Sequence, residues 1–264
     1  MRPSKFTIAF GILLAIFLVA PTIIVTVTSF SAGEIIQFPL KEASLRWYEE
    51  ILTDRGWLQA FGNSLLVGLF AALLAAVFGV SIAFMAARGT AVPRRLIVNA
   101  GIGPILIPVV VIAIGIYMVF SRLGLGGDVP SLAIAHSVIG IPFVFINSLA
   151  AFAALEENVE DAALACGASR AVTLFRIVLP QIAPSVLVGS LLAFGSSWDE
   201  VIVAQFLNTP GFRTIPVVIW GQMREGIQPS TAAVGTLLTL ISMVVFIVIA
   251  LVNLNRGRRR QGVA

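Results

Sequence analysis

Two adjacent carboxylates at the end of a long uncharged stretch are the side chains of this sequence best suited to bind a ligand. Asp199 and Glu200 follow residues 177–198, which carry no charge. A helix continued through that stretch at 1.5 Å per residue would place both acids about 22–24 Å beyond Pro184. An ionised acid that faces lipid costs roughly 2.5–3.5 kcal/mol near the centre of a bilayer. We therefore expect both acids to face protein or water.

These acids could line a path for a positively charged solute. Ser196 lies one helical turn before Glu200 and could belong to the same wall. Consecutive residues of a helix point about 100° apart, so Asp199 and Glu200 need not share one role. Either acid could instead cap a helix or form an ion pair, for example with Arg224.

A second pattern lies in the polar stretch 154–184. Asn158 can cap a short helix whose first turn holds Glu160 and Asp161, where acids suit the positive end of the helix dipole. Gly167 can end that helix in the left-handed conformation. A short surface helix followed by a tight turn is therefore predicted.

A second short helix should follow this turn. Ser169 can cap it, and Pro180 and Pro184 should end or kink it where the chain enters the next uncharged stretch. Residues 154–184 thus favour a helix–turn–helix that lies along a surface.

The composition indicates the environment in which both patterns lie. The 264 residues are 58% apolar and 11% charged, with a mean hydropathy of +1.01. Soluble domains carry about a quarter charged residues, so lipid is the expected solvent.

The sequence holds one cysteine and one histidine. The single cysteine (Cys166) excludes an intrachain disulfide, and the single histidine (His136) is expected to be hydrogen-bonded inside a helix bundle. No catalytic set, metal site or phosphate-binding loop is recognisable, so we expect no enzymatic activity of the chain itself.

Uncharged runs long enough to cross a bilayer occur six times, since a spanning helix needs about 20 apolar residues. The runs are residues 6–33, 56–87, 96–121, 129–155, 177–198 and 227–255. The first is too long for the apolar core of a signal peptide, so we expect it to be retained. The predicted fold is all-α, a polytopic membrane protein with six transmembrane helices in a single domain over residues 1–264.

Basic residues predict that both termini lie in the cytoplasm (N-in/C-in). That orientation puts eleven of the 17 basic residues inside, four of them in the tail. It makes residues 31–58 a periplasmic loop and residues 154–184 a cytoplasmic one. The tail arginines then follow the last span beside anionic headgroups, so membrane lipids, and not nucleic acid, are their expected partners.

The loop at 154–184 resembles the EAA loop of type I ABC importer permeases. The family pattern is Glu-Ala-Ala, three residues, Gly, nine residues, then Ile-x-Leu-Pro, and one acid for another is the single departure here. The matching residues are Asp161, Ala162, Ala163, Gly167, Ile177, Leu179 and Pro180. In that family the loop is the coupling helix, which seats in a groove of the cytoplasmic ATPase. The resemblance implies that these residues, with Glu160, form the coupling loop of this chain.

The segment around the acid pair resembles the spermidine/putrescine branch of these permeases. Where that branch usually has Phe-Asp-Asp, this chain has Trp198, Asp199 and Glu200. The resemblance implies that Ser196 and Trp198 join the two acids along the pathway of a polyamine or a similar small organic cation.

The resemblance also implies an assembly in the bacterial inner membrane. The partners would be a cytoplasmic ATPase dimer that binds ATP and Mg²⁺, a second, paralogous permease subunit, and a periplasmic or lipid-anchored solute-binding protein. An ion-coupled secondary transporter or channel subunit is the main alternative, because acids inside a span suit it equally. A further alternative is the same permease class with another solute (amino acid, opine, phosphonate or iron).

Overall fold

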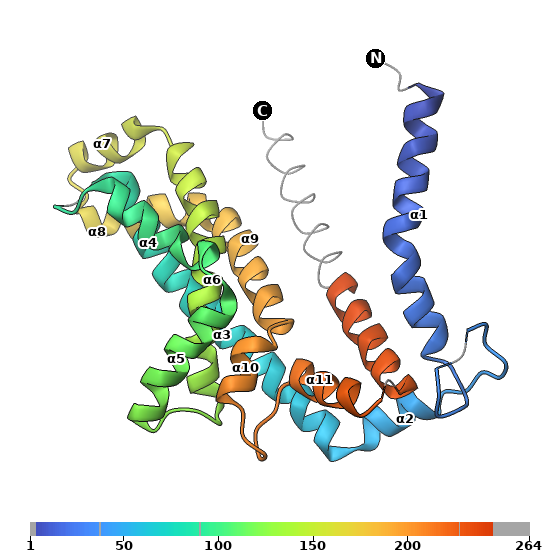
Figure 1. Cartoon of the computed structure of the whole chain (residues 1–264). Helices are drawn as coiled ribbons and strands as arrows, with labels where there is room; N and C mark the ends of the chain where they lie inside the picture. Colours follow the sequence, from blue (N-terminus) through green and yellow to red (C-terminus); the bar gives the residue numbers. More distant parts are fainter. Residues whose placement is uncertain (1–3, 37, 90, 227, 245–264) are drawn as a thin grey trace. The chain divides into compact units, whose positions relative to one another are not determined.

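The computed structural model describes residues 4–36, 38–89, 91–226 and 228–244. The chain divides into two compact units (Figure 1). The terminal unit comprises Met1–Leu58 with Ile219–Ala264, and the central unit comprises Gln59–Val218. Helix is the regular structure of both units, and the described residues form no strand longer than an isolated bridge.

The terminal unit contains α1 (Lys5–Thr28), α2 (Arg46–Thr53) and a helix over Pro229–Val244. Side chains of α1 are exposed almost throughout, as suits a helix surrounded by lipid. In α2, Trp47 is buried, and its Nε1 donates a hydrogen bond of 2.8 Å to the carbonyl oxygen of Ser31. That bond ties the loop after α1 to α2.

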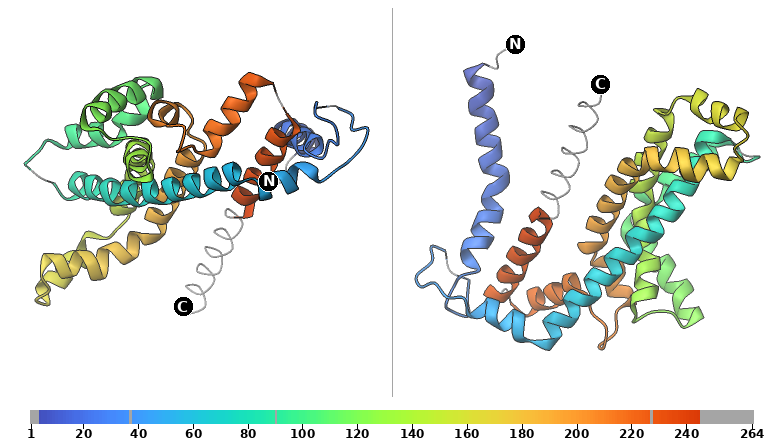
Figure 2. Two further views of the ribbon diagram at one scale, coloured as in Figure 1. Left: turned by 90° about the horizontal axis from the view of Figure 1, so that it is seen from below. Right: turned by 180° about the vertical axis from the view of Figure 1, so that it is seen from behind.

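The central unit contains the remaining helices, with α3 and α11 each crossing its boundary. They are α3 (Arg55–Arg88), α4 (Arg94–Leu106), α5 (Val109–Leu123), α6 (Val129–Ala153), α7 (Glu157–Ala165), α8 (Arg170–Thr173), the π-helical segment η1 (Leu174–Val178), α9 (Leu179–Trp198), α10 (Ile202–Leu207) and α11 (Ile215–Glu225). Helices α7 and α8 lie at one end of this unit and α10 at the opposite end (Figures 1 and 2).

Helices α6 and α9 form the most closely packed pair, and they lie side by side in both figures. A Cβ atom built on Gly189 of α9 would lie 2.7 Å from the Cα atom of Val144 of α6. One built on Gly140 of α6 would lie 3.0 Å from the Cβ atom of Ala193. Small residues therefore let the two backbones approach, which is how helices gain packing contacts in a membrane.

Among the described residues, four helical segments are long and apolar enough to cross a membrane: Lys5–Thr28, Arg55–Arg88, Val129–Ala153 and Arg170–Trp198. The expected span at 96–121 is instead broken into α4 and α5, which are bent by 102° and make a fifth span if counted together. The break is explained by Pro108, which has no N–H and holds the preceding Ile107 in an extended conformation.

The sixth expected span, residues 227–255, continues beyond the described residues. Its described part, Pro229–Val244, is apolar helix but shorter than a span. The described residues therefore contain several helices that are long and apolar enough to cross a membrane. The count of six and the N-in/C-in orientation stay predictions.

Candidate functional site

The first candidate site is α7 with the turn that follows it. The backbone changes from extended to helical at Glu156, so α7 begins at Glu157. Asn158 therefore lies inside the helix, and the prediction that it caps the helix is wrong. Gly167 has a φ of +87°, as predicted for a left-handed stop. The hydroxyl of Ser169 accepts a 3.3 Å hydrogen bond from the amide three residues on, as predicted for a cap.

The second short helix does not end before the membrane-crossing segment. Helix α8 passes through η1 directly into α9, giving one helical segment, Arg170–Trp198. In the π turn the amide of Leu179 donates to the carbonyl of Leu174, five residues back. This wider turn accommodates Pro180 at the start of α9, because a proline nitrogen donates no hydrogen bond. Ile177 thus lies in η1, and Leu179 and Pro180 lie in the first turn of α9.

Most of α7 is open to solvent in this chain. Asp161, Ala162 and Gly167 are exposed, Ala163 is half-buried, and Leu164 keeps 40% of its surface. No side chain described in α7 is fully buried. The helix therefore presents an acid and small side chains to whatever approaches this end of the unit.

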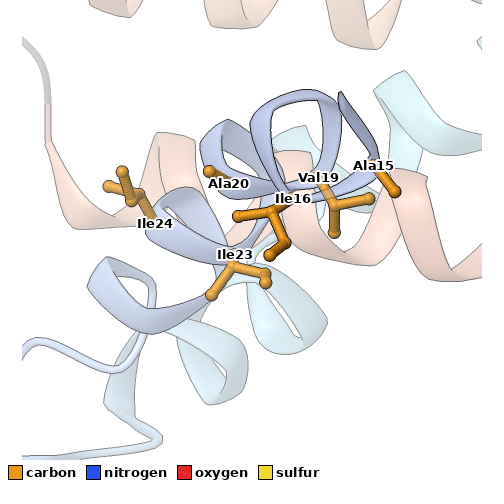
Figure 3. A pocket seen from close by; sticks show the side chains of 6 residues that line it. All are labelled: Ala15, Ile16, Val19, Ala20, Ile23 and Ile24. Atoms are coloured by element: carbon orange, nitrogen blue, oxygen red, sulfur yellow. The ribbon is translucent and has the colours of Figure 1, made fainter. Parts of the chain in front are cut away.

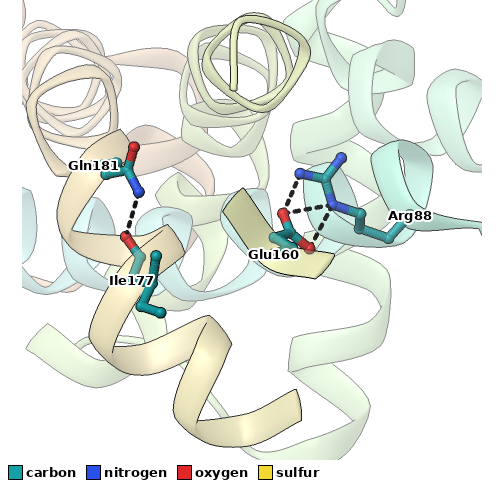
Figure 4. A network of polar contacts seen from close by, with 4 residues as sticks. All are labelled: Arg88, Glu160, Ile177 and Gln181. Carbon is teal, nitrogen blue, oxygen red and sulfur yellow. Dashed lines mark hydrogen bonds and ion pairs between the residues drawn. The ribbon is translucent and has the colours of Figure 1, made fainter. Parts of the chain in front are cut away.

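Glu160 is the exception on this helix, because it has a partner within the chain. The Nε of Arg88 donates to its two carboxylate oxygens, Oε1 at 3.0 Å and Oε2 at 3.2 Å, and Nη2 donates to Oε1 as well (Figure 4). Arg88 is the last residue of α3. Glu160 belongs to the predicted coupling loop, whereas Arg88 is not predicted there. The one signal for Arg88 in the sequence is that a cation directly follows an uncharged run.

The acid pair lies at the other end of the central unit, and it is not helical. Helix α9 ends at Trp198, so the expectation that the helix carries both acids onward is wrong. Asp199 follows the helix and is exposed. Glu200 is half-buried, and its Oε1 accepts a 2.8 Å hydrogen bond from the amide of Val203 in the first turn of α10. Glu200 therefore caps α10 and fixes the direction of the chain after α9.

The surroundings of Glu200 act on its proton affinity in opposite directions. Burial raises the pKa of its carboxyl, and the negative charge of Asp199 raises it further. Hydrogen bonds from the amides of Val203 and Ile202 each lower the pKa, but burial is the largest single effect and the pKa is raised overall. The side chain of Asp199, in contrast, is exposed.

Beside the acids, Ser196 is half-buried and Trp198 stacks on Phe194 with ring centroids 5.4 Å apart. The neighbouring Ser197 is buried, and its hydroxyl lies 2.8 Å from Nδ1 of His136 in α6. The prediction of a histidine hydrogen-bonded inside the bundle is confirmed. This contact fixes the end of α9 against α6.

One described pocket lies elsewhere, on α1 (Figure 3). It is lined by Ala15, Ile16, Val19, Ala20, Ile23 and Ile24. No lining side chain carries a charge or a hydrogen-bonding group, so this hollow does not suit a charged solute.

Comparison with known proteins assigns the chain to a family. Residues 75–258 match the family described as "Binding-protein-dependent transport system inner membrane component". The chain belongs to this family. It is therefore a multi-pass membrane permease of binding-protein-dependent ABC import, and its relatives are transport permeases rather than enzymes.

Two relatives indicate a branch of that family. The chain is 30% identical to the putrescine transport system permease protein PotI of Escherichia coli (strain K12), over 84% of this chain and 81% of that protein. It is 27% identical to the spermidine/putrescine transport system permease protein PotC of the same organism, over 93% of each. The resemblance to this branch is confirmed.

Solved structures share the fold. A chain of a bacterial ABC transporter involved in the import of the acidic polysaccharide alginate matches with a TM-score of 0.70 at 19% identity, over 96% of this chain and 98% of that chain. A chain of an amino acid ABC transporter with histidines matches with a TM-score of 0.51 at 15% identity, over 81% and 96%. The architecture is thus that of an ABC importer permease.

Proposed function

We propose that this chain forms half of the translocation pathway of an ATP-driven importer for a polyamine or a similar small organic cation. The other half is a second permease subunit, and a solute-binding protein delivers the cation from the periplasm. ATP and Mg²⁺ bind to a cytoplasmic ATPase dimer, which supplies the hydrolysis. The observation that carries the proposal is the exposed helix α7, which bears the family's pattern at one end of the permease fold.

Helix α7 is the contact with the ATPase in this proposal. Asp161, Ala162 and Ala163 give a charged first contact followed by small side chains, which allow a partner's backbone to approach closely. Gly167 sets the turn back toward α8, since its φ of +87° is strained for any residue with a Cβ. Ile177, Leu179 and Pro180 connect this turn to the membrane-crossing part through η1.

Asp199 is the residue that we assign to the solute. It is exposed, whereas Glu200 uses its carboxylate to cap α10. The chain's similarity to PotI and PotC supports a cationic solute, and an exposed carboxylate at a helix end is a direct match for an ammonium group. Ser196 and Trp198 lie within one turn of Asp199 and complete the proposed wall.

The assignment of α7 is tested by Asp161→Lys and Gly167→Arg in the complete transporter. We expect both variants to insert in the membrane but to lose solute uptake, because a reversed charge or a bulky, strained residue prevents docking. Cys166→Ser is the matched control, since Cys166 is exposed beside Gly167 and the change keeps its size. Normal uptake by both variants would remove α7 from the coupling contact.

The assignment of Asp199 is tested by measuring uptake of labelled putrescine. We expect Asp199→Asn to raise the apparent KM by about tenfold, the cost of losing one charge-assisted contact. Glu200→Gln keeps an oxygen that can accept from Val203, so its KM should change less. Unchanged KM and rate in both variants would leave the cationic solute without physical support, and uptake of another solute class would replace it.

A further inference from the structure

The contact between Arg88 and Glu160 joins the proposed coupling helix to the body of the permease. It spans 72 positions of sequence and is the one ion pair between residues that the structure describes. Arg88 uses both Nε and Nη2 on the carboxylate, a two-pronged geometry that fixes direction as well as distance. A lysine could supply the charge but not this geometry.

Arg88 is itself held in place by α6. Its guanidinium lies 5.7 Å from the ring centroid of Phe152, a buried residue in the last turns of α6. Phe152 in turn packs against Phe84 of α3, with ring centroids 5.9 Å apart. The arginine therefore bridges three helices, α3, α6 and α7.

Both charges also suit the helices that carry them. Arg88 ends α3, where the helix dipole is negative, and Glu160 lies near the start of α7, where it is positive. The side chains keep only 22% and 23% of their surface, so water screens the pair less than a fully exposed one.

Among the described residues, no other side-chain hydrogen bond or ion pair joins α7 to another helix. None of its described side chains is fully buried, and it is bounded by the linker at Ala154 on one side and the turn at Gly167 on the other. A helix held mainly at its ends can tilt when a partner pushes on it. The ion pair instead transmits such a push to α3 and α6.

We infer that Arg88 and Glu160 are positioning residues that pass the movement of α7 to the membrane-crossing helices. This inference rests on the proposed contact between α7 and the ATPase. It assigns to Glu160 a partner within this chain, in contrast to Asp161, which stays free for the ATPase. Breaking the pair should uncouple ATP hydrolysis from uptake and leave the complex assembled.

The test compares solute uptake with ATP hydrolysis in the complete transporter reconstituted in liposomes. We expect Arg88→Gln and Glu160→Gln each to lower the uptake per ATP hydrolysed by about tenfold, the factor for one lost charge-assisted pair. Arg95→Gln is the matched control, because Arg95 is an exposed cation of the next helix, and it should not change this ratio.

The charge-exchanged variant, Arg88→Glu with Glu160→Arg, separates the pair from the individual residues. Partial recovery of the uptake-to-hydrolysis ratio would support the inference, since a loss of folding alone is not repaired by exchanging charges. A normal ratio in both single variants would overturn it. If the single variants fail to assemble with the ATPase, the exchanged variant decides: recovery of assembly and ratio supports the contact, and failure to recover contradicts it.

The proposed function can fail separately. If Asp161→Lys and Gly167→Arg transport normally, α7 is not the coupling helix, whatever the Arg88 variants do. If those two variants are inactive but the Arg88 and Glu160 variants keep a normal ratio, the coupling contact stands and only the positioning role falls.

Discussion

Replacing Gly189 by alanine should weaken the packing of α9 against α6, the most closely packed helix pair of the central unit. The added Cβ would lie 2.7 Å from the Cα of Val144 and 3.0 Å from the carbonyl oxygen of Phe143, both backbone atoms. Carbon atoms pack at about 3.5–4.0 Å, so the helices must separate locally by about 1 Å. Overpacking of this kind costs about 1–3 kcal/mol.

Gly195→Ala in the same helix is the matched control. A Cβ there meets nothing within 4 Å. Both changes gain the same helix propensity, up to about 1 kcal/mol, so the difference between the two variants isolates the clash. A difference of about 1–3 kcal/mol corresponds to roughly 2–12 °C in the unfolding midpoint of a chain of this size.

The assay is thermal unfolding of the two purified variants and the wild type in one detergent at one heating rate. A common rate matters because membrane proteins often unfold irreversibly. We expect Gly189→Ala to unfold first and Gly195→Ala to match or exceed the wild type. If Gly189→Ala is as stable as Gly195→Ala, the close approach of α6 and α9 at this position is wrong.

Two further predictions concern the turn after α7 in the proposed coupling loop and the end of the chain. Ser169→Ala removes the hydroxyl that caps α8 and should destabilise that turn by about 1 kcal/mol. The loop of the assembled permease should then be cleaved faster by a protease. Ser169→Asp should keep the cap and serves as the control. Replacing Arg258, Arg259 and Arg260, which lie outside the described residues, by glutamine should leave uptake largely intact. The other cations that we predict to be cytoplasmic would still favour the same orientation. Loss of uptake in a correctly inserted tail variant would instead reveal a contact made by the tail.

Much of the architecture follows from patterns local in sequence. Uncharged runs locate α1, α3, α6 and α9, because lipid excludes charge from a spanning helix. Gly167 and Ser169 identify the turn after α7. The role of Gly167 depends on its own backbone conformation, and that of Ser169 on a hydrogen bond to the amide three residues on. The family pattern in the proposed coupling loop is likewise local.

Two kinds of feature could not be predicted from the sequence: helix breaks with a weak local signal, and a contact between segments far apart in the sequence. The bend between α4 and α5 lies in an unbroken apolar run, where charge gives no signal and only Pro108 marks the break. The end of α9 at Trp198 has no glycine or proline at the stop, and Glu200 caps the following helix instead of extending the preceding one. The Arg88–Glu160 contact depends on how α3 and α7 pack together. The two residues are 72 positions apart, and no local sequence pattern predicts a contact over that separation.

The most direct test of the account is the ATPase activity of the complete transporter, reconstituted in liposomes with its solute-binding protein. We predict that hydrolysis by the separate ATPase subunits rises when the binding protein and putrescine are both present, and that Asp161→Lys in this chain abolishes the rise. Uptake driven by an ion gradient without ATP, or hydrolysis indifferent to this chain and to the binding protein, would contradict it.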